Sequence, residues 1–241
     1  MKSFNYKKHN DYKWAMTVDL DRCDGCGACV VACQAENNIP SLGVEQTQEG
    51  RNMLWLRIER YIEGSYPDVK VRFLPMMCQH CDTAPCESVC PVYATYQNNE
   101  GLNVQVYNRC VGTRFCGNNC PYSVRYFNWY DPDFEGKEKN QLNPDVSLRE
   151  KGIMEKCTFC MQRIRRGKDN AADEGREVHD GDIKPACVQT CPTGALEFGN
   201  INDHHSRVSK LAHSGRAISL FEEKGTHPSV KYLKGGTADV F

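Results

Sequence analysis

The chemistry of this 241-residue chain is concentrated in its 15 cysteines, which fall into four groups along the sequence. The first group has the spacing C-x2-C-x2-C-x3-C and consists of Cys23, Cys26, Cys29 and Cys33. Thiolates at these offsets form the bacterial-type ligand run of iron-sulfur clusters. Three cysteines of one tight loop can reach three irons of a cube. The sequence therefore predicts clusters that exchange electrons, with no bond-making catalysis in this chain.

The other three groups vary the same spacing, and a proline follows the last cysteine of each. The second group has two residues inserted before its third member and comprises Cys78, Cys81, Cys86 and Cys90. The third group lacks one cysteine and comprises Cys110, Cys116 and Cys120. The fourth group is divided by a long segment and comprises Cys157, Cys160, Cys187 and Cys191. Four variants of one ligand run indicate several clusters in one chain.

The last cysteine of each run is expected to bind a neighbouring cluster, as in two-cluster ferredoxins. If groups one and four form one pair and groups two and three the other, the ligands cross between groups. A first 4Fe-4S cluster then takes Cys23, Cys26, Cys29 and Cys191. A second takes Cys33, Cys157, Cys160 and Cys187. A third takes Cys78, Cys81, Cys86 and Cys120.

Three thiols remain for the last site, and a 3Fe-4S cluster needs three. These thiols are Cys90, Cys110 and Cys116. Thr113 occupies the position of the missing ligand, and its neutral hydroxyl matches poorly with iron that prefers thiolate. Three 4Fe-4S clusters and one 3Fe-4S cluster use all 15 cysteines.

Zinc sites and disulfides are the alternative uses of so many cysteines. Zinc ribbons close a tetrahedron with two C-x2-C pairs and do not usually generate the four-cysteine run seen here. An odd cysteine count and many cysteines only three residues apart disfavour a disulfide framework. A zinc-stapled interaction module therefore remains the weaker interpretation.

Charge and hydropathy do not identify a partner. The chain has 30 basic and 31 acidic residues, which gives no indication of nucleic acid or of an anionic membrane surface. No run approaches the roughly 20 apolar residues that span a bilayer, and the polar, lysine-rich residues 1–13 contain no secretory signal. We expect the basic run at 163–168 to be a solvated helix face and the adjacent His204 and His205 to be exposed residues at a helix start.

The coarse pattern predicts an α+β fold with ferredoxin-like repeats. A strand at 14–20 delivers the first cysteine loop, and a short helix at 28–37 carries Cys33. Alternating apolar residues at 54–62 and 69–74 predict a two-stranded hairpin. A short strand is expected at 104–107.

The nested ligand pattern predicts an internally duplicated bacterial-ferredoxin-like architecture, with two double-cluster units. The outer unit would comprise residues 14–50 with 150–200, and the inserted unit residues 51–149. A polar surface loop is expected at 169–182, inside the fourth group. Residues 201–241 would form a C-terminal helical tail on the core or on a partner.

Several segments resemble a known family when the four groups are taken together. These segments are ACVVACQAENN, CPVYATY, NRCVGTRFCGNNCPY and PACVQTCPTGAL. They look like the four-cluster electron-transfer subunits of the complex iron-sulfur molybdoenzyme superfamily, over residues 14–233. Within it, the threonine-containing third group is most similar to the iron-sulfur subunit of the Qrc menaquinone reductase complex and to the iron-sulfur module of alternative complex III.

The resemblance implies partners that the residues themselves do not show. These are a molybdopterin-oxidoreductase-like subunit, a multihaem cytochrome c and an integral membrane protein that binds menaquinone. It also implies a peripheral position on the periplasmic face of the cytoplasmic membrane, reached by export with a signal-bearing partner. The alternatives are a subunit of a molybdenum reductase for tetrathionate, polysulfide or arsenate, an alternative complex III module, or a free polyferredoxin.

Overall fold

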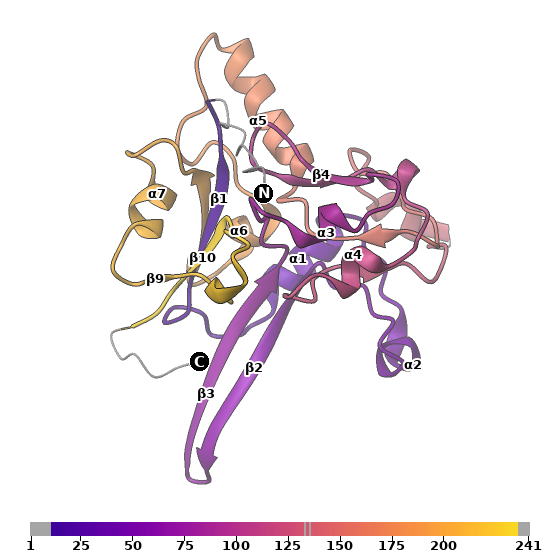
Figure 1. The fold of residues 1–241 in the computed structure, drawn as a ribbon, viewed down its shortest axis with the longest axis horizontal. Coiled ribbons are helices and arrows are strands. Elements are labelled where there is room, and N and C mark those ends of the chain that lie inside the picture. Colours follow the sequence, from indigo (N-terminus) through magenta and orange to yellow (C-terminus); the bar gives the residue numbers. More distant parts are fainter. Residues whose placement is uncertain (1–10, 133, 135, 236–241) are drawn as a thin grey trace, which may run out of the picture.

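The computed structural model describes residues 11–132, 134 and 136–235, and Figure 1 shows their arrangement. The expectation about a secretory signal falls mostly on residues 1–10, and the predicted tail ends at residues 236–241; both lie outside the described residues. Among the residues that are described, no helix has the length and apolar character needed to cross a membrane.

A four-stranded sheet lies on one side of the molecule (Figure 1). In spatial order its strands are β8 (Leu196–Asn200), β1 (Trp14–Asp19), β10 (Val230–Leu233) and β9 (Ala217–Ile218). Strand β1 pairs antiparallel with β8 and parallel with β10, so that Met16 lies between Phe198 and Val230. Because β1 has neighbours on both sides, it is buried along nearly its whole length. The predicted first strand is confirmed, and it leads directly into the first cysteine loop.

The C-terminal segment completes this sheet, which corrects the expectation of a helical tail. Between residues 201 and 235, the helical parts are only α7 (Arg207–Ala212) and the 3-10 turn η3 (Glu222–Lys224). Strands β9 and β10 follow the α7 turn and join the sheet. Local sequence patterns carry little sign of this, because β10 has four residues and pairs with the opposite end of the chain.

The predicted hairpin is confirmed and is longer than expected. Strands β2 (Leu56–Ser65) and β3 (Asp68–Met77) pair in register from Leu56 opposite Met77 to Ser65 opposite Asp68. The hairpin projects away from the rest of the molecule (Figure 1). Its base is buried in the core, whereas Tyr66 at the tip is 92% exposed.

Short helices carry many of the cysteines. They are α1 (Ala28–Glu36), α3 (Pro85–Ser88), α4 (Phe115–Asn118) and α6 (Ala186–Thr190). Two small ladders connect the loops and consist of β4 (Thr95–Gln97) with β5 (Asn103–Gln105) and β6 (Tyr126–Phe127) with β7 (Met154–Glu155). The remaining turns are α2 (Gly43–Gln48), η1 (Tyr107–Arg109) and η2 (Gly136–Gln141). The predicted helix 28–37 is confirmed, and the predicted strand 104–107 ends earlier because η1 begins at Tyr107.

Helix α5 (Met161–Asp173) differs from the sequence expectation in two ways. It extends into the predicted surface loop 169–182, and the basic run on it is not simply solvated. Arg163 pairs with Glu36 at 2.6 Å. Arg166 and Lys168 form ion pairs with the acidic residues Asp145 and Glu100, respectively. These contacts fasten α5 to three segments that are distant in sequence.

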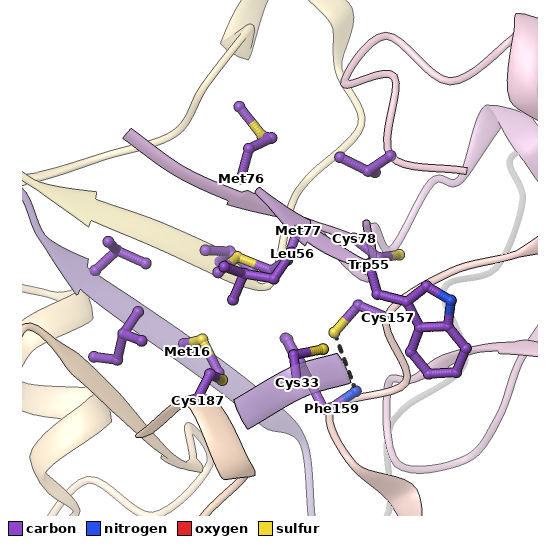
Figure 2. Close-up of a cluster of buried hydrophobic side chains, with 14 of the residues drawn as sticks. Met16, Cys33, Trp55, Leu56, Met76, Met77, Cys78, Cys157, Phe159 and Cys187 are labelled. Atoms are coloured by element: carbon purple, nitrogen blue, oxygen red, sulfur yellow. Dashed lines mark hydrogen bonds between the residues drawn. The ribbon is translucent and has the colours of Figure 1, made fainter. Parts of the chain in front are cut away.

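The core mixes aromatic and aliphatic side chains with thiols, as Figure 2 shows. One contiguous cluster includes Trp14 and Cys33 of the proposed outer unit together with Leu56 and Cys78 of the inserted unit. The two units therefore share an interior. Cysteine sulfur occupies positions that aliphatic side chains fill in most domains.

We predict that the buried hydroxyl of Tyr232 holds β10 against the base of the hairpin. It donates to the carbonyl oxygen of Pro75 at 2.9 Å and accepts from the Gln79 side-chain amide at 3.2 Å. Tyr232→Phe should destabilise the fold by about 1–3 kcal/mol, because buried polar groups lose a partner. At this chain length each kcal/mol lowers Tm by about 2–4 °C. Tyr66→Phe is the exposed control, and equal thermal midpoints for the two variants would contradict this role.

Candidate metal centres

The 15 cysteines lie in four sets that match the ligand sets expected from the spacing. We name them site 1 (Cys23, Cys26, Cys29, Cys191), site 2 (Cys33, Cys157, Cys160, Cys187), site 3 (Cys78, Cys81, Cys86, Cys120) and site 4 (Cys90, Cys110, Cys116). In the described part of the chain, no group of three or more His, Cys, Asp and Glu side chains is placed to hold a single metal ion. The thiols of sites 1, 3 and 4 instead line three small cavities, one at each site.

Site 1 is formed by the loop between β1 and α1 and by the end of α6. The base of the hairpin closes the cavity with Ile58 and Pro75. The loop can turn tightly because Gly25 and Gly27 have φ of +73° and +79°, a region that side chains with Cβ disfavour. A Cβ on Gly25 would lie 2.4 Å from the Phe73 ring, whereas one on Gly27 would meet no atom within 4 Å. The hairpin therefore packs directly against the ligand loop.

The thiols of site 1 differ in their environments. Burial raises the pKa of Cys29 to about 12. Burial also acts on Cys191, but the Thr193 hydroxyl and the N–H of Ala195, which lies 3.3 Å from the sulfur, lower the pKa of this thiol below its ordinary value. Cys26 is exposed. This site therefore combines a shielded interior with one sulfur at the surface.

Site 2 lies in the interior, and all four of its cysteines are buried. The side-chain amide of Asn37 donates toward the sulfurs of Cys33 and Cys160 at 3.6 and 3.7 Å. The N–H of Phe159 donates to the sulfur of Cys157 at 3.4 Å, as the dashed line in Figure 2 shows. Asn37 was not expected from the sequence, although its position four residues after Cys33 on α1 could have indicated it.

The thiols of site 2 are mutually close and poorly solvated. Burial raises the pKa of Cys33 well above its usual value, and the neighbouring Cys157, Cys160 and Cys187 raise it further. The protein alone thus favours neutral thiols here. Bound metal reverses this preference, because a coordinating thiol is deprotonated outright. The donor set fits iron-sulfur clusters, since soft thiolates suit them and hydrogen bonds to sulfur are a usual feature of such sites.

Site 3 is built by the loop before α3 and by Cys120 at the end of the α4 segment. Its cavity is also lined by Asn103, Tyr122 and Arg125. Burial raises the pKa of Cys86 to about 11, although the positive charge of Arg125 opposes this change. Site 3 thus has a cation in its wall, whereas the residues that line site 1 include none.

Site 4 has three thiols, and Thr113 lies on the wall of the same cavity. The N–H of Ala94 donates to the sulfur of Cys90 at 3.2 Å, and the N–H of Met154 donates to that of Cys110 at 3.3 Å. Thr113 is exposed. The structure therefore brings together the three thiols and the threonine that the spacing had grouped.

The four sites follow one another through the molecule in the order 1, 2, 3, 4. After burial and the thiols of its own site, Cys29 of site 1 raises the pKa of Cys187 in site 2. Cys78 of site 3 likewise raises the pKa of Cys157 in site 2, and Figure 2 shows these two cysteines close together. Arg125 lies between the thiols of site 3 and those of site 4. Neighbouring sites are thus close enough for their charges to interact.

One prediction about other residues is confirmed, and two buried cations were not predicted. His204 and His205 are exposed, as expected. The buried cations Arg125 and Lys156 were missed, because a basic residue near a cysteine run carries no periodic signal that distinguishes it from a surface residue. Lys156 is fully buried and donates to the carbonyl oxygen of Cys157 at 2.9 Å.

Comparisons with known proteins agree on iron-sulfur chemistry. Two models described as "4Fe-4S dicluster domain" match residues 22–94 and 69–136. The chain is 47% identical to the "Menaquinone reductase, iron-sulfur cluster-binding subunit" of Nitratidesulfovibrio vulgaris, covering 92% of this chain and 88% of that protein. It is 37% identical to "Hdr-like menaquinol oxidoreductase iron-sulfur subunit 1" of Archaeoglobus fulgidus, with 93% and 84% covered. It is 36% identical to a tetrathionate reductase subunit of Salmonella typhimurium, with 95% and 75% covered.

We predict that Gly25→Ala disrupts site 1 selectively. The added Cβ would overlap the Phe73 ring at 2.4 Å, and φ would remain in the unfavourable left-handed region. The purified variant should lose up to about four irons per chain, the content of one cubane cluster. Gly27→Ala is the matched control, because it adds about 1–2 kcal/mol of backbone strain without a clash. Iron analysis separates the two, and equal iron contents would contradict the packing argument.

Proposed function

Because the chain belongs to the family of iron-sulfur electron-transfer subunits of complex iron-sulfur molybdoenzymes, we propose that it relays electrons to or from menaquinone. The other end of the relay is a molybdopterin-oxidoreductase-like subunit together with a multihaem cytochrome c. Menaquinone is held by an integral membrane protein of the same complex. The observation that carries the proposal is the row of four cysteine sites, each adjacent to the next.

The proposed cofactors are 4Fe-4S clusters at sites 1, 2 and 3 and a 3Fe-4S cluster at site 4. When bound, such clusters accept and release single electrons at potentials set by cluster type, hydrogen bonds to sulfur and solvent exposure. The residues of this chain hold them, donate N–H groups to their ligands and exclude water. The three-iron assignment is supported by Thr113, whose hydroxyl is a poor substitute for a thiolate.

The burial of the thiols supports exchange of electrons at the two ends of the row. All cysteines of site 2 are buried, as are three of the four at site 3. Site 1 has the exposed Cys26, and site 4 has the partly exposed Cys90 and Cys110. Electrons would therefore enter at one outer site and leave at the other.

The surface at site 4 supports contact with the integral membrane protein. Val92 and Val111 line its cavity and are 38% and 63% exposed. The nearby Tyr93 and Phe115 are also exposed. Large exposed apolar side chains around a functional site are typical of protein contact surfaces. This arrangement is consistent with a peripheral protein on the periplasmic face of the cytoplasmic membrane, with site 1 directed toward the molybdopterin-oxidoreductase-like subunit.

A molybdenum reductase is the second candidate, and the 36% identity to a tetrathionate reductase subunit supports it. Its electron-transfer chain would use the same four sites, with molybdenum in the partner. A module of alternative complex III would share the sites as well. The higher identity to a menaquinone reductase subunit favours the first candidate.

The test is metal analysis of the native complex that contains this chain. We expect about 15 non-haem irons per chain, the total of three four-iron clusters and one three-iron cluster, together with haem and without molybdenum. About one molybdenum per complex would contradict the first candidate and support a molybdenum reductase. Zinc in place of iron would overturn the electron relay.

We predict that Thr113→Cys converts site 4 into a four-iron site. The new thiolate supplies the missing ligand, so the iron content should rise by about one per chain, and the EPR signal of the oxidised three-iron cluster should disappear. Turnover with quinone should slow, because the terminal potential changes.

Thr113→Ser is the control for this substitution, since it keeps a hydroxyl and adds no thiolate. It should retain the three-iron signal and the turnover rate. Unchanged spectra and rates in Thr113→Cys would contradict the three-iron assignment.

A further inference from the structure

Arg125 is a buried cation whose side chain donates hydrogen bonds to three neutral side chains. Its side chain is 8% exposed. The guanidinium donates to Gln105 Oε1 at 3.0 Å, to Thr95 Oγ1 at 2.6 Å and to Asn103 Oδ1 at 3.1 Å. Three side-chain oxygens from β4 and β5 therefore fix both its position and its orientation.

No carboxylate forms an ion pair with Arg125 among the described residues. Glu87 forms no ion pair with it: burial raises the pKa of Glu87, the charge of Arg125 opposes that rise, and the Asn103 amide donates to the Glu87 carboxyl group at 2.6 Å. The other deeply buried arginine, Arg149, pairs directly with Glu155 at 3.0 Å. A buried charge is costly unless it is paired, so the charge of Arg125 requires another source of compensation.

The cysteine ligands of two different sites would supply that compensation, because a coordinating thiol is deprotonated when metal is bound. Arg125 lines the site 3 cavity. Although burial opposes the charged form, the thiols Cys86 and Cys78 of site 3 and Cys116 of site 4 raise the pKa of Arg125. This single guanidinium thus faces the ligands of two adjacent sites at once.

A fixed cation in a poorly solvated interior changes the free energy of adding an electron. Each one-electron reduction adds one negative charge to a cluster, and a nearby positive charge stabilises it more strongly than in water. Net charge and hydrogen bonding are among the factors that set cluster potentials. A cation between two sites must act on both in the same direction.

We infer that Arg125 is a positioning residue that raises the reduction potentials of the clusters at sites 3 and 4 together. This inference rests on the proposed ligand sets. The reduction potentials of the clusters at sites 3 and 4 would then depend on the same side chain. They would therefore change together when the surroundings of Arg125 change.

The experiment is an anaerobic redox titration of the native complex, followed by EPR, in Arg125→Gln and Arg125→Lys. Arg125→Gln removes the charge and keeps hydrogen-bonding capacity, so the midpoint potentials of sites 3 and 4 should both fall. Arg125→Lys keeps the charge and should retain values close to those of the unmodified protein. Sites 1 and 2 serve as internal references and should not move.

Arg57→Gln is the matched control for disturbance of the same loop. Arg57 donates to the carbonyl oxygens of Tyr122 and Ser123, but Glu59 neutralises its charge at 2.6 Å. Arg57 is 23% exposed and lines neither the site 3 nor the site 4 cavity, so its removal should leave the potentials of these sites in place. Unchanged potentials in Arg125→Gln, or equal shifts at all four sites, would overturn the inference.

A second variant covers the case in which Arg125→Gln loses a cluster. Gln105→Glu places a carboxylate where the amide oxygen now lies 3.0 Å from Arg125, so it neutralises the cation without removing it. The potentials of sites 3 and 4 should again fall together, and unchanged potentials would overturn the inference. EPR signals in the unmodified complex test the ligand sets separately, so failure of one proposal is distinct from failure of the other.

Discussion

The interior of this protein must accommodate thiol groups whose charged form it disfavours. Burial raises the pKa of Cys29, Cys33, Cys81 and Cys187, and metal binding requires the opposite state. Cluster binding is therefore linked to folding, as at other structural metal sites. The short helices and tight loops follow from this constraint, because each must aim a thiol at a cavity. In a long helix or strand, most side chains would point away from a single cavity.

Hydrogen-bond donors and fixed cations offset the effect of burial, because they favour the charged form of the thiols. Backbone N–H groups reach Cys90, Cys110, Cys157 and Cys191. Such bonds favour the thiolate. Cations are concentrated near the middle of the row, where Lys156 lies beside site 2 and its charge acts on Cys86 of site 3. Positive charge therefore lies where cysteines of neighbouring sites approach one another.

The cysteine spacing predicted which thiols meet, because each run surrounds one cavity and its last cysteine is expected to reach the neighbouring one, as in two-cluster ferredoxins. Ligation itself stays a prediction. Local patterns also predicted β1, α1 and the hairpin, where apolar residues alternate over many positions. They gave no sign of β10 or of the ion pairs of the basic run on α5, although Arg165 and Arg166 of that run are exposed on a helix as expected. The partners of both lie far away in the sequence, and neither four residues of strand nor four basic residues reveal them.

The residues that tune the sites were the hardest to predict, for a physical reason. Asn37 and Arg125 make contacts that depend on how separate loops pack. Ligand spacing is a local property, but the electrostatic environment of a ligand is a property of the whole fold. Relatives that share the cysteine pattern can therefore differ in potential through neighbouring side chains. The burial of sites 2 and 3 and the exposure of Cys26 then favour electron exchange with partners at the outer sites of the row.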